Sequence, residues 1–302
     1  MTTTRAGRRP AFVRLACAMS AACAASAVAQ TPDVAVKLDA VLHYRSGMNQ
    51  PTTLRFYDSL AHPSTVALTF HLETGFRGYV SERLQKIPND GDSEQLEQYY
   101  IEDPGIWRFG KQALPFGKES LLRMMGKAAR GDATLPFRYL PVAGAICDNG
   151  EGLTRGVVGR IGSRALGASF AVGRNIGIDS SCLAVLRRPE DGLGSGRGYQ
   201  QAYGVDYGRK LGDWRVQAEY VTLLRGETPK DVVQDVSDIM FILEPTRYQS
   251  VTFAWSREWG QTLDMFRIEA HIWATRNVWI EPLVRYRNGS FFDLGVSVRV
   301  KL

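Results

Sequence analysis

The chain has 302 residues, of which 44% are hydrophobic and 23% are charged, and its formal net charge is +6. This balance excludes a disordered chain, and it fits one large β-barrel or two ordinary soluble domains. Beyond residue 29, no apolar run has the length and continuity of a transmembrane helix, so a membrane-inserted chain would have to cross with strands.

Residues 1–29 have the pattern of a secretory signal peptide. Four arginines precede an apolar run over 15–28, which ends in the cleavage motif Ala27-Val28-Ala29. A membrane-anchoring N-terminus is the alternative, but the run is shorter than the ~20 residues that a spanning helix needs. Neither Cys17 nor Cys23 follows a convincing lipidation motif. We therefore expect the mature chain to start at Gln30.

Cleavage lowers the net charge from +6 to +2, because the signal peptide carries four arginines and no acidic residue. The mature chain is nearly balanced, so its composition does not predict a nucleic-acid partner. Cys147 and Cys182 are the cysteines that remain, and an oxidising compartment would allow them to pair. Whether this disulfide forms stays open, because sequence does not give the distance between them.

Alternation of apolar and polar residues with a period of two recurs along the whole mature chain. It is clearest at the C-terminus, where Phe292, Leu294 and Val296 begin an apolar face that continues to Leu302. Asn288-Gly289-Ser290 predicts a tight turn before that strand. The predicted strands cover 34–44, 64–73, 76–86, 95–102, 105–112, 153–162, 165–174, 198–209, 213–224, 236–244, 248–258, 262–273, 277–287 and 291–301.

Strands of about ten residues with one apolar face predict an all-β fold, a transmembrane antiparallel β-barrel of about 12–14 strands over 30–302. Both termini would lie in the periplasm, and long extracellular loops would include 45–63, 113–152, 175–197 and 225–235, with both cysteines in such loops. A soluble antiparallel sandwich shares the alternation. Aromatic residues near strand ends favour the membrane, because they would form interfacial girdles; they are Tyr44, Trp107, Tyr207, Trp214, Trp255, Trp273 and Tyr286.

The segment Gly110-Lys111-Gln112-Ala113-Leu114-Pro115-Phe116-Gly117 ends one strand and opens the longest predicted loop. It resembles the Gly-x-x-x-x-Pro-Phe-Gly segment of Gram-negative outer-membrane porins related to the phosphate-selective and siderophore-uptake porins. The resemblance covers eight residues, with Gly110, Pro115, Phe116 and Gly117 as its motif. It implies a single-chain barrel that passes small solutes, with the following loop often folded into the lumen. A purely structural reading is that Pro115 and Gly117 end the strand.

Because successive side chains of a strand point to opposite faces, the position of each charged residue in its strand (its parity) predicts whether it lines a lumen. If the 113–152 loop folds inward, its cations could attract anions, although a solvated surface loop has the same composition. The slight excess of arginine weakly favours anions, and a bulge at Gly110 would shift the local parity. The candidate pore-lining residues are Arg108, Arg123, Arg130, Arg215, Arg267, Glu269, Arg285 and Arg287.

These patterns predict a porin-like channel in the bacterial outer membrane that acts by passive diffusion of small polar or anionic solutes. A structural or adhesive barrel with a filled interior is the alternative, and an outer-membrane lipid hydrolase is a weaker one. No catalytic residue, cofactor or metal site is predicted, since the four histidines lack a nucleophile-and-base arrangement near the outer surface. The expected partners are membrane lipids, small solutes and further copies of the chain.

Overall fold

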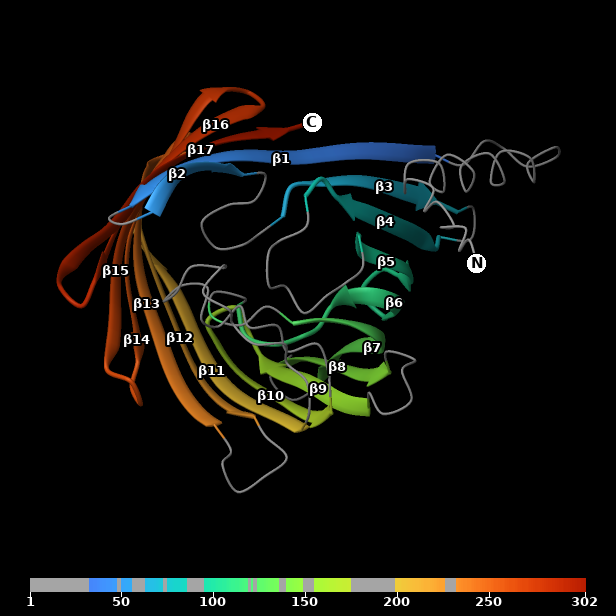
Figure 1. Ribbon diagram of the computed structural model, residues 1–302. Coiled ribbons are helices and arrows are strands. Elements are labelled where there is room, and N and C mark those ends of the chain that lie inside the picture. The colour runs from blue at the N-terminus through green and yellow to red at the C-terminus, as the bar shows by residue number, and fades with distance from the viewer. Residues whose placement is uncertain are drawn as a thin grey trace, which may run out of the picture.

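The computed structural model describes residues 33–47, 50–55, 63–72, 75–85, 95–118, 121, 124–135, 140–148, 155–174, 199–225 and 232–302 (Figure 1). The predicted signal peptide lies outside the described residues. No described helix is long and apolar enough to cross a membrane. The strands are β1 (Asp33–Gly47), β2 (Gln50–Arg55), β3 (Thr65–His71), β4 (Arg77–Arg83), β5 (Leu96–Asp103), β6 (Trp107–Ala113), β7 (Met125–Leu135), β8 (Leu140–Asp148), β9 (Arg155–Gly162), β10 (Leu166–Arg174), β11 (Tyr199–Leu211), β12 (Trp214–Arg225), β13 (Val232–Thr246), β14 (Gln249–Glu258), β15 (Leu263–Thr275), β16 (Val278–Arg287) and β17 (Ser290–Lys301).

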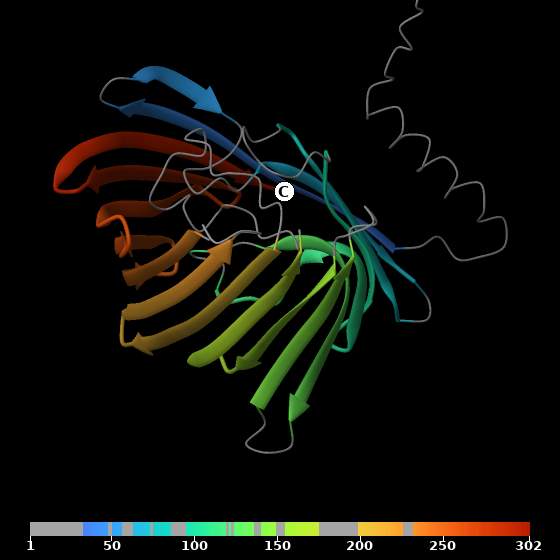
Figure 2. The same cartoon turned by 60° about the horizontal axis from the view of Figure 1, so that its bottom comes forward.

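The strands form one closed antiparallel ring (Figures 1 and 2). Along one edge β1 pairs with β17, with Asp39 opposite Lys301. Along its other edge β1 pairs first with β3 and then with β2, so β2 and β3 together occupy one position in the ring. The barrel therefore has 16 strands. Barrels with 16 to 18 strands are wide enough to enclose an aqueous channel.

All fourteen predicted strands are present, but the predicted number of 12–14 is too low. The missing pair is β7 and β8, which occupy 125–148 within the predicted 113–152 loop. Alternation failed there because small residues fill both faces: β7 reads Met-Gly-Lys-Ala-Ala-Arg-Gly-Asp-Ala-Thr-Leu. Likewise, β2 lies in the predicted 45–63 loop, and β13 begins inside the predicted 225–235 loop. A strand is fixed by pairing with its neighbours even when its own side chains give no period.

The barrel has its apolar surface on the outside and its polar residues inside. Phe109, Ile146 and Leu166 are 68%, 67% and 64% exposed on the outer face, whereas Glu219 and Asp293 are 3% and 0% exposed on the inner face. A water-soluble protein has the opposite distribution, since it buries large apolar side chains. An outer wall of this kind is suited to lipid, and the charged residues of the described strands gather on the inner face, as in membrane barrels.

The last predicted hairpin forms as the sequence indicates. Asn288 and Gly289 have φ of 47° and 77°, which are the two positive values that a two-residue type I′ turn requires. The turn sets Arg287 opposite Ser290. At Gly110 the local parity is not shifted, because β5 and β6 keep continuous register through Tyr100–Gly110 and Tyr99–Lys111.

One predicted girdle residue faces the wrong way for contact with lipid. Trp273 pairs with Trp279, and both share the face of His271 and Glu281, which hydrogen-bond on the inner wall. The prediction that Trp273 belongs to the outer girdle is therefore wrong. Its position near a strand end suggested that it lies at the membrane–water interface. In β15, however, it is on the same face as His271, which puts it at the mouth of the lumen.

Candidate functional site

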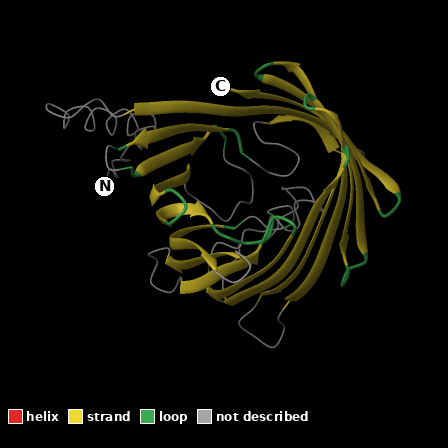
Figure 3. Ribbon diagram, turned by 180° about the vertical axis from the view of Figure 1, so that it is seen from behind, coloured by secondary structure: helices red, strands yellow, loops and turns green. Residues whose placement is uncertain are grey.

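The segment that follows β6 enters the barrel (Figure 3) and is held by β10 and β12. The Gly117 N–H donates to Ser169 Oγ of β10 at 2.9 Å. The N–H groups of Lys118 and Leu121 donate to Glu219 Oε1 and Oε2 of β12, each at 3.1 Å. Both oxygens of one buried carboxylate thus accept from the segment. We call Leu114–Lys118, Leu121 and Met124 the constriction segment.

Gly117 is required for this attachment. Its φ is +51°, and a Cβ atom placed there would lie 1.7 Å from Glu219 Oε1. Any other residue would therefore be strained and would also collide with the carboxylate. Next to it, the Phe116 ring packs over Gly204 of β11, where an added Cβ would be 3.1 Å from the ring. The Pro-Phe-Gly motif thus does more than end β6, since it docks the segment on β10, β11 and β12.

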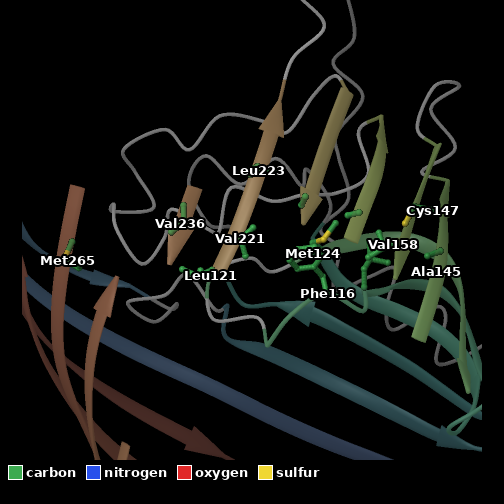
Figure 4. Packing of buried hydrophobic residues seen from close by; sticks show 14 of the residues in the cluster. Phe116, Leu121, Met124, Ala145, Cys147, Val158, Val221, Leu223, Val236 and Met265 are labelled. Carbon is green, nitrogen blue, oxygen red and sulfur yellow. The ribbon is translucent and has the colours of Figure 1, made fainter. Parts of the chain in front are cut away.

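An apolar cluster on the same wall also fixes the segment (Figure 4). Phe116, Leu121 and Met124 are at most 2% exposed and pack with the inner residues of neighbouring strands. These wall residues are small or aliphatic, so the segment can lie close to them; they include Ala128, Ala145, Cys147, Val158, Ala171, Ala202, Val221, Leu223 and Val236. Burying one large apolar side chain stabilises by roughly 1.5–3 kcal/mol, which is similar to one hydrogen bond to a charged group, so packing and hydrogen bonds both hold the segment.

Cys147 belongs to this cluster, in β8, and is 1% exposed. The prediction that it lies in an extracellular loop is wrong, because 140–148 form a strand whose odd residues point inward. Cys147 is a free thiol. Cys182, its predicted partner, lies outside the described residues.

Charged groups meet where the constriction segment touches β9 and β11. Arg160 donates hydrogen bonds to both oxygens of Asp206, the shortest at 2.8 Å, and Lys118 Nζ lies 3.8 Å from the same carboxylate. Burial lowers the pKa of Lys118, and the Asp206 carboxylate opposes that shift. A cavity of about 470 Å³ adjoins this cluster and is lined by Pro115, Phe116, Arg130 and Arg160 among other residues. Solvent therefore reaches the charged side of the constriction.

A second group of charges lies on β4, β5 and β6. Glu102 forms ion pairs with Arg77 and with Arg108, whose Nη2 is 2.7 Å from Glu102 Oε2. The Arg108 guanidinium also stacks over the Tyr100 ring, 4.1 Å from its centroid. One buried carboxylate thus orients two arginines that are partly open to the lumen.

The wall formed by β15, β16 and β17 carries pairs that are closed to solvent. Arg285 donates to both oxygens of Asp293, at 2.8 and 2.6 Å, and both side chains are at most 1% exposed. Arg267 Nε lies 3.7 Å from Glu269 Oε2. Arg287 lies over the Phe292 ring, with its Cζ 5.7 Å from the centroid.

The mouth at which both chain ends lie is more open. Glu244 of β13 pairs there with Arg215 at 2.7 Å and with Lys210 at 3.4 Å. Further along the sheet, His271 of β15 hydrogen-bonds Glu281 of β16 at 3.2 Å, and Arg299 of β17 pairs with the same Glu281 at 3.2 Å. Fixed charges of both signs therefore surround this mouth.

The structure brings some candidate residues together and separates others. The side chains of Arg108, Arg215, Arg267, Glu269, Arg285 and Arg287 lie on the inner face, as strand parity predicts. Arg130 also faces inward, but from β7 and paired with Asp132 at 2.7 Å rather than from a loop. Arg123 lies outside the described residues. The contribution of these residues to a pore stays a prediction.

Sequence reasoning missed two residues. Ser169 accepts a hydrogen bond from the constriction segment, and Arg160 pairs with Asp206. Period-two alternation does put Ser169 on the inner face of its strand, yet nothing in the sequence shows which loop it meets. That partner is 52 residues away along the chain.

The described residues contain a histidine-serine pair, which bears on the hydrolase alternative. His43 Nδ1 lies 2.8 Å from Ser297 Oγ, but the two residues are only 2% and 4% exposed. A lipid substrate has no access to a hydroxyl buried in this way. Among the described residues, no group of three or more His, Cys, Asp or Glu side chains is arranged to hold a metal ion.

Comparison with solved structures finds barrels of the same architecture. A loop L8 deletion mutant of OmpT, an outer membrane protein of Vibrio cholerae, superposes with a TM-score of 0.62 at 9% identity, covering 90% of this chain and 100% of that one. The outer membrane channel DcaP of Acinetobacter baumannii gives 0.59 at 10% identity, with 90% and 97% covered. An anion-selective porin from Comamonas acidovorans gives 0.56 at 9% identity, with 89% and 99% covered.

This chain has the outer-membrane porin fold. No family model and no curated protein sequence matches it. The likeness at these identities is one of fold, so the predicted membership of the phosphate-selective and siderophore-uptake group stays a prediction. What the chain shares with these porins is a closed 16-stranded wall.

Proposed function

We propose that this protein is a channel of the bacterial outer membrane through which small polar or anionic solutes diffuse passively. The observation that carries the proposal is the constriction segment, which is clamped on Glu219 and Ser169 inside a barrel with an apolar outer wall. A segment anchored there narrows the lumen without blocking it. Such a constriction selects solutes by size and charge.

The charge of the lumen supports a preference for anions. At the constriction, Lys118 and Arg160 share the single carboxylate of Asp206, and nearby Arg77 and Arg108 share Glu102. With the Glu219 carboxylate beside Lys118, the first group is balanced in charge, whereas the second has one more cation than anion. A field of this sign, focused by a narrow passage, raises the local concentration of anions.

Single-channel recording of the refolded mature protein in a planar bilayer tests the proposal. We expect discrete current steps and, across a KCl gradient, a reversal potential biased toward chloride. Arg108→Gln should shift that potential toward cations. Arg209→Gln, which removes the same charge from the outward face of β11, is the matched control and should leave it unchanged. Stable insertion of the protein without current steps would refute the channel.

A structural barrel with a filled interior is the second candidate, and one observation favours it. Arg285, Asp293, Arg83 and Glu97, all inside the barrel toward the end away from the termini, are at most 2% exposed. Charged groups buried this fully leave little water around them at that end. Absence of conductance in the bilayer experiment would turn this candidate into the better one.

Location, processing and assembly follow from the same proposal. The signal peptide over 1–29 would export the chain, the barrel over 30–302 would insert into the outer membrane, and no catalytic role is proposed. In-vitro folded OmpT of Vibrio cholerae is described as a trimer form. We propose that this chain likewise forms a homo-oligomer, which chemical cross-linking in detergent would reveal as a discrete band above the monomer.

A further inference from the structure

A row of three aromatic rings lies at the mouth that holds both chain ends: Tyr248 in the turn between β13 and β14, Trp273 in β15 and Trp279 in β16. The backbone N–H of Trp273 donates to the backbone carbonyl of Tyr248 at 3.0 Å, and Trp273 lies opposite Trp279 in the strand pairing. Pairing continues from this row to His271 and Glu281, which meet on the inner wall. The three rings therefore line the lumen rather than the lipid-facing surface.

The rings leave flat surfaces open. Tyr248 and Trp273 meet edge to face with centroids 5.0 Å apart, and Trp273 and Trp279 do so at 5.4 Å. Tyr248 and Trp273 remain 41% and 39% exposed. Edge-to-face contact uses the rim of one ring, and Arg247 and Lys301 each cover one face of Tyr248 and of Trp279, respectively. The exposed faces that remain, above all that of Trp273, are free to stack on a planar molecule.

A cavity of about 640 Å³ lies beside these rings, and its charge is positive. It is lined by Arg247, Tyr248, Trp273, Thr275 and Arg276, with no carboxylate. Neither arginine forms an ion pair with any residue that the structure describes. The Arg247 guanidinium stacks over Tyr248, 4.6 Å from the ring centroid, so its remaining donors can face an anion.

A second aromatic pocket at the opposite end of the same strands provides a contrast. It measures about 570 Å³ and is lined by Trp255, Phe266 and Tyr286 together with Asp264 and Asn288. Its rings point outward, and its one charged lining group is a carboxylate that already pairs with Arg257 at 3.5 Å. The two pockets therefore differ although both contain aromatic rings. The pocket at the mouth combines its rings with arginines, and the other pocket does not.

We propose that the pocket formed by Tyr248, Trp273 and Arg276 binds small aromatic carboxylates at the mouth of the lumen. The ring of the solute stacks on the exposed aromatic faces, while its carboxylate pairs with the arginines. A pocket of this volume holds a small organic molecule. The inference rests on the proposed channel for the route by which the solute arrives, and it names the class of solute that the channel retains.

Calorimetric titration of the full mature protein in detergent tests the pocket with three probes. Benzoate carries both the ring and the charge, acetate carries the charge alone, and benzamide carries the ring alone. We expect benzoate to bind about fivefold or more tightly than either of the others. Equal affinity for benzoate and acetate would overturn the proposal, since it would indicate a site for anions in general.

Variants then locate the binding. Arg276→Gln and Trp273→Leu should each weaken benzoate binding about fivefold. Arg257→Gln removes one guanidinium from the other end of β14 and is the matched control, which should change nothing. Circular dichroism establishes that each variant is folded. Equal effects of Arg276→Gln and Arg257→Gln would overturn the assignment to this pocket.

The titration and the bilayer experiment can fail separately. A protein that conducts but does not bind benzoate refutes the pocket and leaves the channel intact. A protein that binds benzoate with the expected variant pattern but does not conduct refutes the channel and leaves the pocket as a binding site. In a conducting protein, benzoate should block the current more strongly than acetate does, and Trp273→Leu should remove that difference.

Discussion

Two walls of the lumen are stabilised in different ways. The wall of β8 to β12 presents small and aliphatic residues, and the constriction segment packs on it through Phe116, Leu121 and Met124. The wall of β15 to β17 presents charged residues that pair with each other, with Arg285 and Asp293 as the most buried example. The first wall is adapted to hold a protein segment. In the second wall, the charged side chains pair with one another within the sheet. A lumen can therefore be narrowed on one side without losing its polar surface on the other.

The largest effect should come from breaking the buried ion pair of the charged wall. Arg285→Ala leaves the Asp293 carboxylate buried with Arg45 as a distant partner at 3.9 Å, so we expect a loss of about 3 kcal/mol in the free energy of unfolding. Chemical denaturation in lipid vesicles measures it. The double variant Arg285→Ala/Asp293→Ala should lose less than the sum of the two single variants. Strict additivity would show that the pair is not coupled.

The next effect should come from displacing the constriction segment. Gly117→Ala puts a methyl group where the Glu219 carboxylate lies, so the segment has to leave its anchor and single-channel conductance should rise. The strain of the left-handed backbone adds a destabilisation of about 1–2 kcal/mol. Gly212→Ala has a similar φ of +61° with nothing within 4 Å of the new methyl group, so it controls for strain. If both variants conduct alike, the segment does not set the width of the lumen.

A milder change at the same anchor removes one acceptor. Glu219→Gln keeps the shape of the side chain but turns one of its two accepting oxygens into an N–H₂ group that faces a backbone N–H. We expect a cost of about 1.5 kcal/mol and larger current fluctuations in single-channel records, because the segment is held less firmly. Glu244→Gln alters a more exposed pair at the mouth and should leave the fluctuations unchanged. Current fluctuations in Glu219→Gln no larger than those of the wild-type protein would contradict the proposal that Glu219 holds the constriction segment in place.

The smallest effect should come from the exposed pair at the mouth. Lys210 is 66% exposed and lies 3.4 Å from Glu244, which also pairs with Arg215. Solvent screening leaves such pairs little net energy, so Lys210→Gln should change the free energy of unfolding by less than about 0.5 kcal/mol. A loss comparable to that of Arg285→Ala, measured by the same denaturation, would remove the distinction between buried and exposed pairs.

Much of the barrel could be predicted from the sequence, because period-two alternation is a local property. The predicted strands at 213–224 and 277–287 match β12 and β16 to within a residue. Where small residues occupy both faces, as in β7, the alternation disappears and the strand was missed. Cys147 was misplaced for the same reason, since it lies in the partner strand of β7.

Prediction of the candidate site was less complete. The Pro-Phe-Gly motif indicated a loop that folds inward, and parity indicated that Glu219 and Asp206 face the lumen. Their meeting could not be predicted, since Lys118 and Glu219 are 101 residues apart. The lumen-facing position of Trp273 follows from parity, yet its location near a strand end suggested a lipid girdle.

The sequence by itself determined that this chain alternates apolar and polar residues in strands long enough to cross a membrane, because each strand carries its own two faces. The tertiary structure decided which residues meet across the lumen. Closing the ring brings inner residues from distant strands within a few ångströms of one another. Only then do a glycine without room for a Cβ atom, a carboxylate with two accepting oxygens and a row of three aromatic rings become a constriction and a mouth.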